Sequence, residues 1–359
     1  MERLYALGVS CIEFVQDWFE GSEGYFKLVN HVSNPHHMTE ILFPLLSIVD
    51  SVFAAQLLLC MAFGGWLNAV MKWWLLEDRP YWWVRETSFY DGIHRPRLRQ
   101  YPQTCETGPG SPSGHTATAS ALLVLFLMWA EHFMNDRKFR LWWWKYVGYT
   151  VFVVGLGSVM LARMYVATHF PHQCILGALI GSFMAPALCL YVSDPCIWQW
   201  GGRAGTEGGA LIRRHALAAG IATVIAVLTY YGLVACGCDP QYTIKLAFRW
   251  CETPEDIHVS TTPLYALVES TAYLLGWALT VTPAVARYRH NSKDRSILIS
   301  IFATSLVLYG YKHVKDNICT SNTLQYYAVH YALCFFKPML LLRAVPAIAM
   351  WPFTKSKND

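Results

Sequence analysis

Charged residues are scarce in this chain. Only 14% of its 359 residues are Asp, Glu, Lys or Arg, whereas a soluble domain carries about 25%. Hydrophobic residues make up 54% of the chain, and fifteen of them are tryptophans. This composition argues for an integral membrane protein in a lipid bilayer. The net charge of +4 is small and scattered, so no nucleic-acid partner is expected.

Several sequence signals are missing as well. The chain has no internal repeat, no low-complexity tract and no Asn-x-Ser/Thr site, so neither a solenoid nor ordinary N-glycosylation is expected. The segment from Met1 to Phe19 has no clean apolar core, so a cleavable signal is not expected. The eleven cysteines form no C-x-x-C pair and no zinc-type spacing, so the cysteines indicate no zinc site. Four cysteines could pair in an oxidising compartment, in a combination that the sequence leaves open: Cys105, Cys236, Cys238 and Cys251.

Long uncharged runs predict the membrane helices, because about 20 apolar residues span the hydrocarbon core. Eight runs qualify or nearly so: 51–71, 116–130, 146–162, 173–193, 216–238, 270–286, 296–311 and 318–336. A ninth helix around 27–49 is the weakest, because polar residues interrupt it. The sequence therefore predicts an all-α integral membrane protein with about nine transmembrane helices. It forms a single membrane domain over residues 1–359, with one long extramembrane loop over 72–112.

The distribution of lysine and arginine predicts the orientation. If the helices alternate in direction, one side collects 15 of the 28 basic residues, among them Arg137, Lys138 and Arg140. Cytosolic loops are richer in Lys and Arg. This modest bias predicts a cytosolic C-terminus and places the 72–112 loop on the opposite face of the membrane.

Basic residues and histidines gather at the ends of four predicted helices. Lys72 ends one helix and Arg79 follows it, Ser113-Gly114-His115 opens the next, Arg163 ends the third, and His169 precedes the fourth. Because two helices carry the chain across the membrane and back, all four groups should emerge on the same face.

These residue types suit phosphoryl transfer, which needs cations and N–H donors around the phosphoryl oxygens. Lys72, Arg79 and Arg163 supply positive charge, and Ser113 and Gly114 supply neutral donors at a helix start. The two histidines can divide into a nucleophile and a general acid/base. Each residue alone would more often be an ordinary interfacial anchor, and the glycine-rich stretch an ordinary loop. Their coincidence on one face favours a phosphate site.

The same motifs support a family resemblance. Lys72-x6-Arg79-Pro80, Pro112-Ser-Gly-His115 and Arg163-x5-His169 resemble the three-part signature of the type 2 phosphatidic acid phosphatase/vanadium haloperoxidase superfamily. The longer blocks resemble the glucose-6-phosphatase catalytic subunits, namely Arg79-Pro-Tyr-Trp-Trp-Val84, Cys105-Glu-Thr-Gly-Pro-Gly-Ser-Pro-Ser-Gly-His115 and His169-Phe-Pro-His-Gln173.

The resemblance implies a role for each residue. His169 would attack phosphorus and form a phosphohistidine, and His115 would protonate the departing sugar oxygen and later activate water. The other residues would hold the phosphoryl oxygens, namely Lys72, Arg79, Ser113, Gly114 and Arg163. Gln173 would orient the nucleophile's ring, in the place of the aspartate of many relatives. Ala162 stands where many superfamily members have a serine, which puts one phosphate contact in doubt.

The resemblance also implies a cellular setting. The helical phosphatase core, about residues 51–193, would hydrolyse glucose 6-phosphate without a metal or another cofactor at the luminal face of the endoplasmic reticulum. A glucose-6-phosphate transporter would supply the substrate. Lys355 and Lys357 near the end of the chain resemble a dilysine retrieval signal of that membrane. The alternatives are a lipid or other phosphomonoester phosphatase of the same superfamily, and a non-catalytic transporter or regulatory protein. Trp82, Trp83 and Tyr81 could stack on a sugar or form an interfacial aromatic belt.

Overall fold

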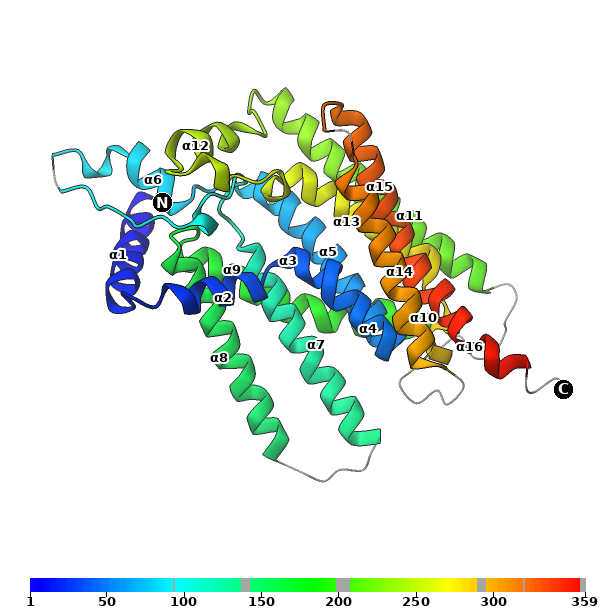
Figure 1. The fold of residues 1–359 in the computed structure, drawn as a ribbon. Coiled ribbons are helices and arrows are strands. Elements are labelled where there is room, and N and C mark those ends of the chain that lie inside the picture. The colour runs from blue at the N-terminus through cyan, green and yellow to red at the C-terminus, as the bar shows by residue number, and fades with distance from the viewer. Residues whose placement is uncertain (93, 137–142, 198–206, 289–294, 319, 356–359) are drawn as a thin grey trace. The chain divides into compact units, whose positions relative to one another are not determined.

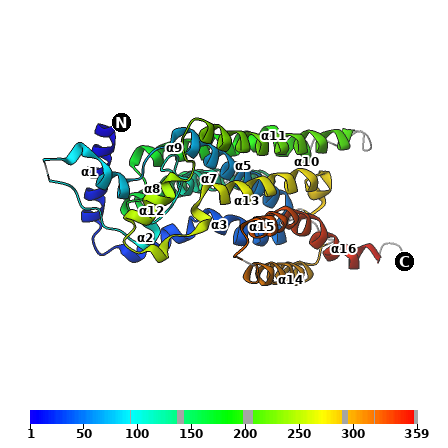
Figure 2. The same cartoon turned by 90° about the horizontal axis from the view of Figure 1, so that it is seen from above.

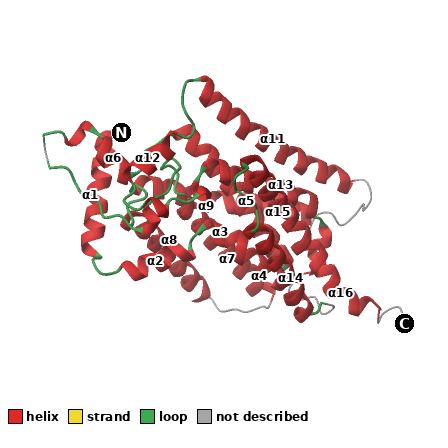
Figure 3. Cartoon of the chain, turned by 45° about the horizontal axis from the view of Figure 1, so that its top comes forward, coloured by secondary structure: helices red, strands yellow, loops and turns green. Residues whose placement is uncertain are grey.

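A computed structural model of the chain describes residues 1–92, 94–136, 143–197, 207–288, 295–318 and 320–355. These residues form helices joined by loops, and no strand occurs in the described ranges (Figure 3). The expected all-α class is therefore confirmed. Arg137, Lys138, Arg140 and Lys357, on which the predicted orientation and the retrieval signal partly depend, lie outside the described residues.

The first half of the chain contains the helices that carry the predicted site (Figure 1). In chain order they are α1 (Glu2–Trp18), α2 (Glu23–Val32), α3 (Pro35–His37), η1 (Met38–Leu42), α4 (Phe43–Val49), α5 (Ser51–Leu75), α6 (Pro80–Glu86), η2 (Ser88–Tyr90), η3 (Pro102–Thr104), α7 (Gly114–Asp136), α8 (Trp143–Tyr165) and α9 (Pro171–Leu188).

The second half continues with further long helices and short irregular turns. They are η4 (Cys189–Ser193), α10 (Asp194–Ile197), α11 (Glu207–Ala235), α12 (Tyr242–Trp250), η5 (Pro254–Asp256), η6 (Val259–Thr261), α13 (Pro263–Thr280), η7 (Pro283–Tyr288), α14 (Ile297–Asp316), α15 (Thr323–Met339), η8 (Leu340–Ala344) and α16 (Val345–Lys355).

Each predicted apolar run overlaps a helix, although the ends differ by several residues. Among the described residues, seven helices are long and apolar enough to cross a membrane: α5, α7, α8, α9, α11, α14 and α15. A total of nine stays a prediction. The weak segment 27–49 is broken into α2, α3, the π-helical η1 and α4. The predicted loop 72–112 begins later than expected, because α5 continues through Lys72 to Leu75, and it contains the short helix α6.

The chain divides into two compact units, each assembled from three stretches. Unit 1 comprises Met1–Pro35, Leu67–Pro186 and Ala226–Ala266, and unit 2 comprises His36–Trp66, Ala187–Ile225 and Leu267–Asp359. All residues predicted to take part in chemistry lie in unit 1. The assignment of the whole chain to one membrane domain stays a prediction.

Within unit 1, α7 and α8 run side by side in opposite directions (Figure 1). Helix α9 approaches α7 closely through its glycines, since a Cβ atom on Gly177 would lie 2.5 Å from the carbonyl oxygen of Ser113. Helix α1 was not foreseen, but it is amphipathic. It buries Tyr5, Val9 and Ile12 in a cluster with Phe170, next to the predicted nucleophile.

Unit 2 is also helical and contains buried polar contacts. Helices α14 and α15 lie side by side (Figure 2), and the hydroxyl of Tyr311 donates to the carbonyl oxygen of Leu333 at 2.9 Å. His36 pairs with Glu269 at 3.3 Å, and the Lys337 ammonium donates to the carbonyl oxygen of Thr39 at 2.9 Å. These contacts satisfy polar groups that lipid could not satisfy.

Candidate active site

Arg79 precedes α6 and is completely buried. Its Nε atom donates to the carbonyl oxygen of Gly108 at 2.6 Å, and one terminal nitrogen donates to that of Pro109 at 3.2 Å. The other terminal nitrogen, Nη1, lies 3.3 Å from the carbonyl oxygen of Thr168. Arg79 therefore joins the glycine-rich stretch to the loop that carries His169, and it presents Nη1 to the space between them.

The glycine-rich stretch is held against its neighbours by backbone contacts. The N–H of Gly110 donates to the carbonyl oxygen of Glu77 at 2.7 Å, and the N–H of Ser113 donates to that of Gln173 at 3.1 Å. A Cβ atom on Gly110 would lie 2.4 Å from the carbonyl oxygen of Asp78. Only glycine allows this close approach, which gives a local reason for the residue type.

A tight turn at the end of α8 lies between Arg163 and His169. Ala167 has a positive φ of 52°, its N–H donates to the carbonyl oxygen of Met164 at 2.8 Å, and the N–H of Thr168 donates to that of Arg163 at 3.2 Å. This is the pattern of a Schellman cap, with alanine at the position that glycine usually occupies. The cap reverses the chain immediately after the helix, so that the Arg163-x5-His169 spacing brings both side chains to one place.

The ring of His169 is fully buried and held at both nitrogens. Nδ1 lies 2.7 Å from the carbonyl oxygen of Gly110, and Nε2 lies 3.3 Å from Nη1 of Arg79. A carbonyl oxygen can only accept, so Nδ1 carries the proton and Nε2 has a lone pair. Burial lowers the pKa of His169 well below its usual range, and Arg79 and Arg163 lower it further against the opposing charge of Glu106. The ring is therefore neutral at pH 7, with the lone pair of Nε2 turned toward Arg79.

Glu106 lies at the centre of the cluster, although the sequence reasoning assigned it no role. Its carboxylate pairs with Arg163 and, at 3.0 Å, with Nη1 of Arg79. It is also 3.6 Å from Nδ1 of His115 and 3.9 Å from Nε2 of His169. Burial disfavours its charged form, but Arg163 and Arg79 outweigh this effect and hold the pKa of the carboxyl well below its usual range.

One sequence signal could have revealed Glu106, because it is the only charged residue between Cys105 and Gly114. An isolated acid in a stretch suited to anion binding calls for a cationic partner. We call the five cationic or ionisable side chains around this carboxylate the basic cluster; they are Lys72, Arg79, His115, Arg163 and His169.

The other predicted residues are Lys72 and His115, which belong to this cluster, and Ser113 and Gly114, which directly precede His115 in the chain. Lys72, in the last turn of α5, is buried and interacts electrostatically with Arg79, Glu106 and Arg163. Ser113 is buried, and its hydroxyl accepts a hydrogen bond from Thr116 at 3.0 Å. Gly114 begins α7, where backbone N–H groups lack intrahelical acceptors. The side chain of His115 is 15% exposed, whereas that of His169 is 0% exposed, so His115 lies nearer to solvent.

Gln173 holds the loop of the nucleophile, while the ring itself is held by Gly110. Its amide oxygen accepts from the N–H of Phe170 at 3.1 Å, and its nitrogen donates to Glu77 at 3.0 Å. His172, which the sequence left without a role, lies 2.9 Å from the same Glu77 carboxylate and stacks against Phe170. These contacts tie the start of α9 to the residues that precede Arg79.

Asn30 is a second residue that the sequence reasoning missed. Its side-chain oxygen accepts from a terminal nitrogen of Arg163 at 2.8 Å, and its amide nitrogen lies 3.5 Å from the carbonyl oxygen of Ala162. Arg163 thus has a buried neutral partner from α2, in the region where Ala162 lacks the serine hydroxyl of many superfamily members. No local signal marks Asn30, because α2 lies far from the motifs in sequence.

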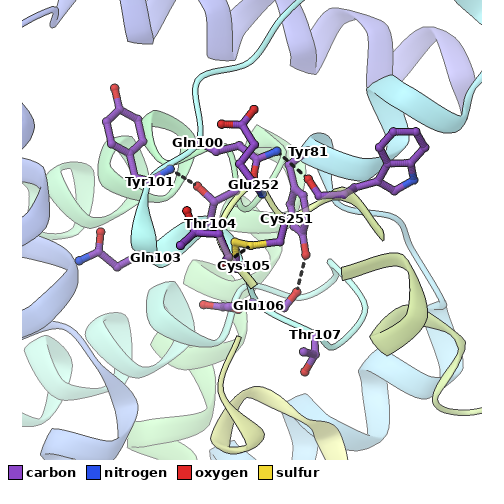
Figure 4. Close-up of a disulfide and its surroundings, with 12 residues drawn as sticks. Tyr81, Gln100, Tyr101, Gln103, Thr104, Cys105, Glu106, Thr107, Cys251 and Glu252 are labelled. Carbon is purple, nitrogen blue, oxygen red and sulfur yellow. Dashed lines mark hydrogen bonds between the residues drawn. A yellow bond between two sulfur atoms is a disulfide. The ribbon is translucent and has the colours of Figure 1, made fainter. Parts of the chain in front are cut away.

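A disulfide joins Cys105 to Cys251 next to Glu106 (Figure 4). It resolves the choice among the four candidate cysteines, since Cys236 and Cys238 are free. The hydroxyl of Tyr81 donates to the backbone carbonyl oxygen of Glu106 at 3.0 Å. The disulfide and this hydrogen bond anchor the backbone on which the Glu106 side chain is mounted.

The aromatic residues after Arg79 pack inside unit 1. Tyr81, Trp82 and Trp83 are all buried in the cluster that contains α1 residues and Phe170. Trp82 also donates through its indole nitrogen to Asp78 at 2.9 Å. These side chains pack in the same cluster as Phe170, the residue that follows His169. Within the described ranges, no group of three or more His, Cys, Asp or Glu side chains is arranged to hold a metal ion.

Comparison with known proteins identifies the family. Residues 53–195 match the model of the PAP2 superfamily, and this range contains every predicted site residue. The chain is 31% identical to glucose-6-phosphatase catalytic subunit 1 of Rattus norvegicus, over 94% of this chain and 91% of that protein. It is 32% identical to glucose-6-phosphatase 2 of Homo sapiens, over 96% of each chain. The chain belongs to the glucose-6-phosphatase catalytic subunit family.

Membership of the glucose-6-phosphatase family agrees with the chemistry of the site. The PAP2 phosphatase domain contains two arginines, a lysine and two histidines around one anionic group, as a phosphatase requires. The similarity covers nearly the full length of these relatives, so it extends well beyond residues 53–195. No solved structure matches the fold.

Proposed function

We propose that this chain hydrolyses glucose 6-phosphate to glucose and phosphate through a phosphohistidine intermediate. The observation that carries the proposal is the convergence of Arg79, Arg163, His115 and His169 on one carboxylate, Glu106. A site that binds one oxyanion with these groups is suited to bind another. The names of the relatives supply the substrate, glucose 6-phosphate.

In the first step, Nε2 of His169 attacks phosphorus. Arg79, Arg163 and Lys72 neutralise the phosphoryl oxygens, and the Ser113 hydroxyl and the Gly114 N–H donate to them. The bond from phosphorus to the sugar oxygen breaks, and His115 transfers a proton to that oxygen, so that glucose leaves as an alcohol. The neutral ring of His169, with its proton on Nδ1 toward Gly110, is in the form that this step needs.

In the second step, water replaces the sugar. His115, now neutral, removes a proton from water as the water oxygen attacks phosphorus, and the phosphorus–nitrogen bond to His169 breaks. Phosphate forms and His169 regains its lone pair at Nε2. The position of His115 near solvent suits both of its tasks, since sugar and water must arrive from that side.

We place this chemistry at the luminal face of the endoplasmic reticulum, with the C-terminus in the cytosol. The Cys105–Cys251 disulfide supports an oxidising compartment for the segment next to Glu106. The charge bias of the loops and the two lysines near the C-terminus support the same orientation. Glucose 6-phosphate is a polar anion that does not cross lipid, so a luminal site needs a glucose-6-phosphate transporter as its partner.

The test uses the full-length chain in microsomal membranes with glucose 6-phosphate or phosphatidic acid. We expect phosphate release from glucose 6-phosphate and a loss of more than about a thousandfold in kcat for His169→Ala. A brief pulse with labelled substrate should trap an acid-labile, base-stable phosphoenzyme that His169→Ala lacks.

Three outcomes would contradict the proposal. Hydrolysis of phosphatidic acid alone would make the chain a lipid phosphatase. Label on serine would move the nucleophile to Ser113. Unchanged phosphate release from His169→Ala would remove the nucleophile assignment. His132→Ala, in the cytosolic half of α7 and away from the basic cluster, is the matched control and should retain activity.

A further inference from the structure

The carboxylate of Glu106 takes up the N–H groups that a phosphoryl group would need. Arg79 donates hydrogen bonds from Nε to the carbonyl oxygen of Gly108 and from one terminal nitrogen to that of Pro109. Its other terminal nitrogen, Nη1, lies 3.0 Å from the carboxylate of Glu106. One terminal nitrogen of Arg163 donates a hydrogen bond to Asn30, and the other pairs with the carboxylate of Glu106. Nη1 of Arg79 also donates to the carbonyl oxygen of Thr168, so a phosphoryl group cannot use the N–H bonds that point at Glu106 while the carboxylate remains on them.

The charges around Glu106 explain why it lies there. Lys72, Arg79 and Arg163 are three buried cations, and buried charges need a partner of opposite sign. Glu106 supplies the negative charge that holds them together in the absence of a ligand. A phosphate dianion carries more charge and more acceptor oxygens than a carboxylate, so it can take over this task.

The side chain of Glu106 can leave without a rearrangement of the backbone. The disulfide at Cys105 and the hydrogen bond from Tyr81 fix its main chain, so any displacement is a rotation of the side chain. The Glu106 side chain is 14% exposed, whereas those of Arg79 and Arg163 are 0% exposed. Glu106 is therefore more accessible than the two guanidinium groups with which it pairs.

We propose that Glu106 occupies the phosphoryl position in the free enzyme, is displaced by the substrate, and returns to expel the product phosphate. This inference rests on the proposed function, since it assumes that phosphate binds at the basic cluster. Glu106 is then an internal competitor for phosphate. It lowers the affinity of the site for inorganic phosphate, and its return speeds product release.

The experiment measures the binding of inorganic phosphate to the purified full-length chain in detergent micelles by isothermal titration calorimetry. Glu106→Gln keeps the size of the side chain but removes the charge that the arginines prefer. We expect Glu106→Gln to bind inorganic phosphate about tenfold more tightly than the wild type, or better. In turnover assays the same variant should show stronger product inhibition by phosphate and a lower kcat.

Two further variants make the result interpretable. Glu252→Gln neutralises an exposed carboxylate beside the same disulfide and should bind phosphate as the wild type does. Glu106→Asp shortens the side chain and draws the carboxylate back from the arginines, so it should also tighten phosphate binding, by a smaller factor. It serves as the test if Glu106→Gln does not fold.

The opposite results separate two failures. Weaker or equal phosphate binding by Glu106→Gln and Glu106→Asp would overturn the displacement and show that Glu106 holds the arginines for the substrate. If neither the wild type nor any Glu106 variant binds phosphate, the proposed function is overturned together with this inference.

Discussion

The Nδ1 atom of His169 lies 2.7 Å from the carbonyl oxygen of Gly110, a residue 59 positions earlier in the chain. The contact selects the tautomer of His169 and links the glycine-rich stretch to the loop after α8. The carbonyl oxygen of Gly110 thus orients the ring, while the side chain of Gln173 contacts the N–H of Phe170.

Replacing Gly110 by alanine should move the carbonyl oxygen that orients His169. A Cβ atom there would lie 2.4 Å from the carbonyl oxygen of Asp78 and 2.6 Å from the amide nitrogen of Gln173, so the backbone must shift. A displacement of about 1 Å can cost a hundredfold in rate, and we expect a loss of at least that size in kcat. Gly157→Ala in α8, where a Cβ atom meets nothing within 4 Å, is the control and should keep its rate.

The buried neutral form of His169 should make thermal stability depend on pH. The folded pKa is lowered well below its usual range, so between that pKa and about 6.5 the unfolded chain binds a proton that the folded chain does not. The free energy of unfolding is therefore not reduced by His169 above about pH 6.5, and it falls as the pH falls below this value. We expect a larger drop in Tm from pH 7.5 to pH 5.5 for the wild type than for His169→Gln.

The lowered pKa of Glu106 affects the stability of the fold in a different pH range. Its stabilisation is present above the unfolded pKa of about 4.3 and is lost only as the pH falls further, so it does not disturb the comparison between pH 5.5 and 7.5. Equal drops in Tm for the wild type and His169→Gln would contradict a neutral, buried ring.

Removing the Asn30 side chain should leave the guanidinium group of Arg163 less firmly positioned. The Asn30 oxygen lies 2.8 Å from a guanidinium nitrogen, and a hydrogen bond to a charged group is worth about 1.5–3 kcal/mol. We therefore expect Asn30→Ala to lower kcat/KM for glucose 6-phosphate by about tenfold or more. Asn30→Asp restores an acceptor for Arg163 and should recover much of the loss. If it recovers nothing while the protein stays folded, the role of Asn30 is not to position Arg163.

Breaking the Cys105–Cys251 disulfide should destabilise the segment that carries Glu106. The bond closes a separation of 146 residues, and the loss of a disulfide typically costs about 2–4 kcal/mol. Cys251→Ser should lower Tm, and a reducing agent should lower the Tm of the wild type but not that of Cys251→Ser. Cys11→Ser removes an exposed free thiol and should leave Tm unchanged. A reductant effect of equal size on Cys251→Ser would point to another bond.

The motifs could be read from the sequence because their spacing is local. The Schellman cap after α8 needs only consecutive residues, and it alone brings Arg163 and His169 to one place. Lys72 and His115 could be placed on the same face by counting membrane crossings. The isolated charge of Glu106 calls for a cationic partner, but the sequence does not say which cations it meets, and it gives no sign of the role of Asn30. Both depend on partners far away in the chain.

Composition and periodicity determined that this chain is a helical membrane protein, because low charge and long apolar runs leave a lipid-embedded helix as the stable form. They also determined which residues have the chemistry to bind and transfer a phosphoryl group. Only the tertiary structure decided which cysteines pair, which atom orients His169, and that a carboxylate from the glycine-rich stretch lies among the arginines. The physical reason is that these contacts join segments far apart in sequence, and no local pattern encodes the distance between them.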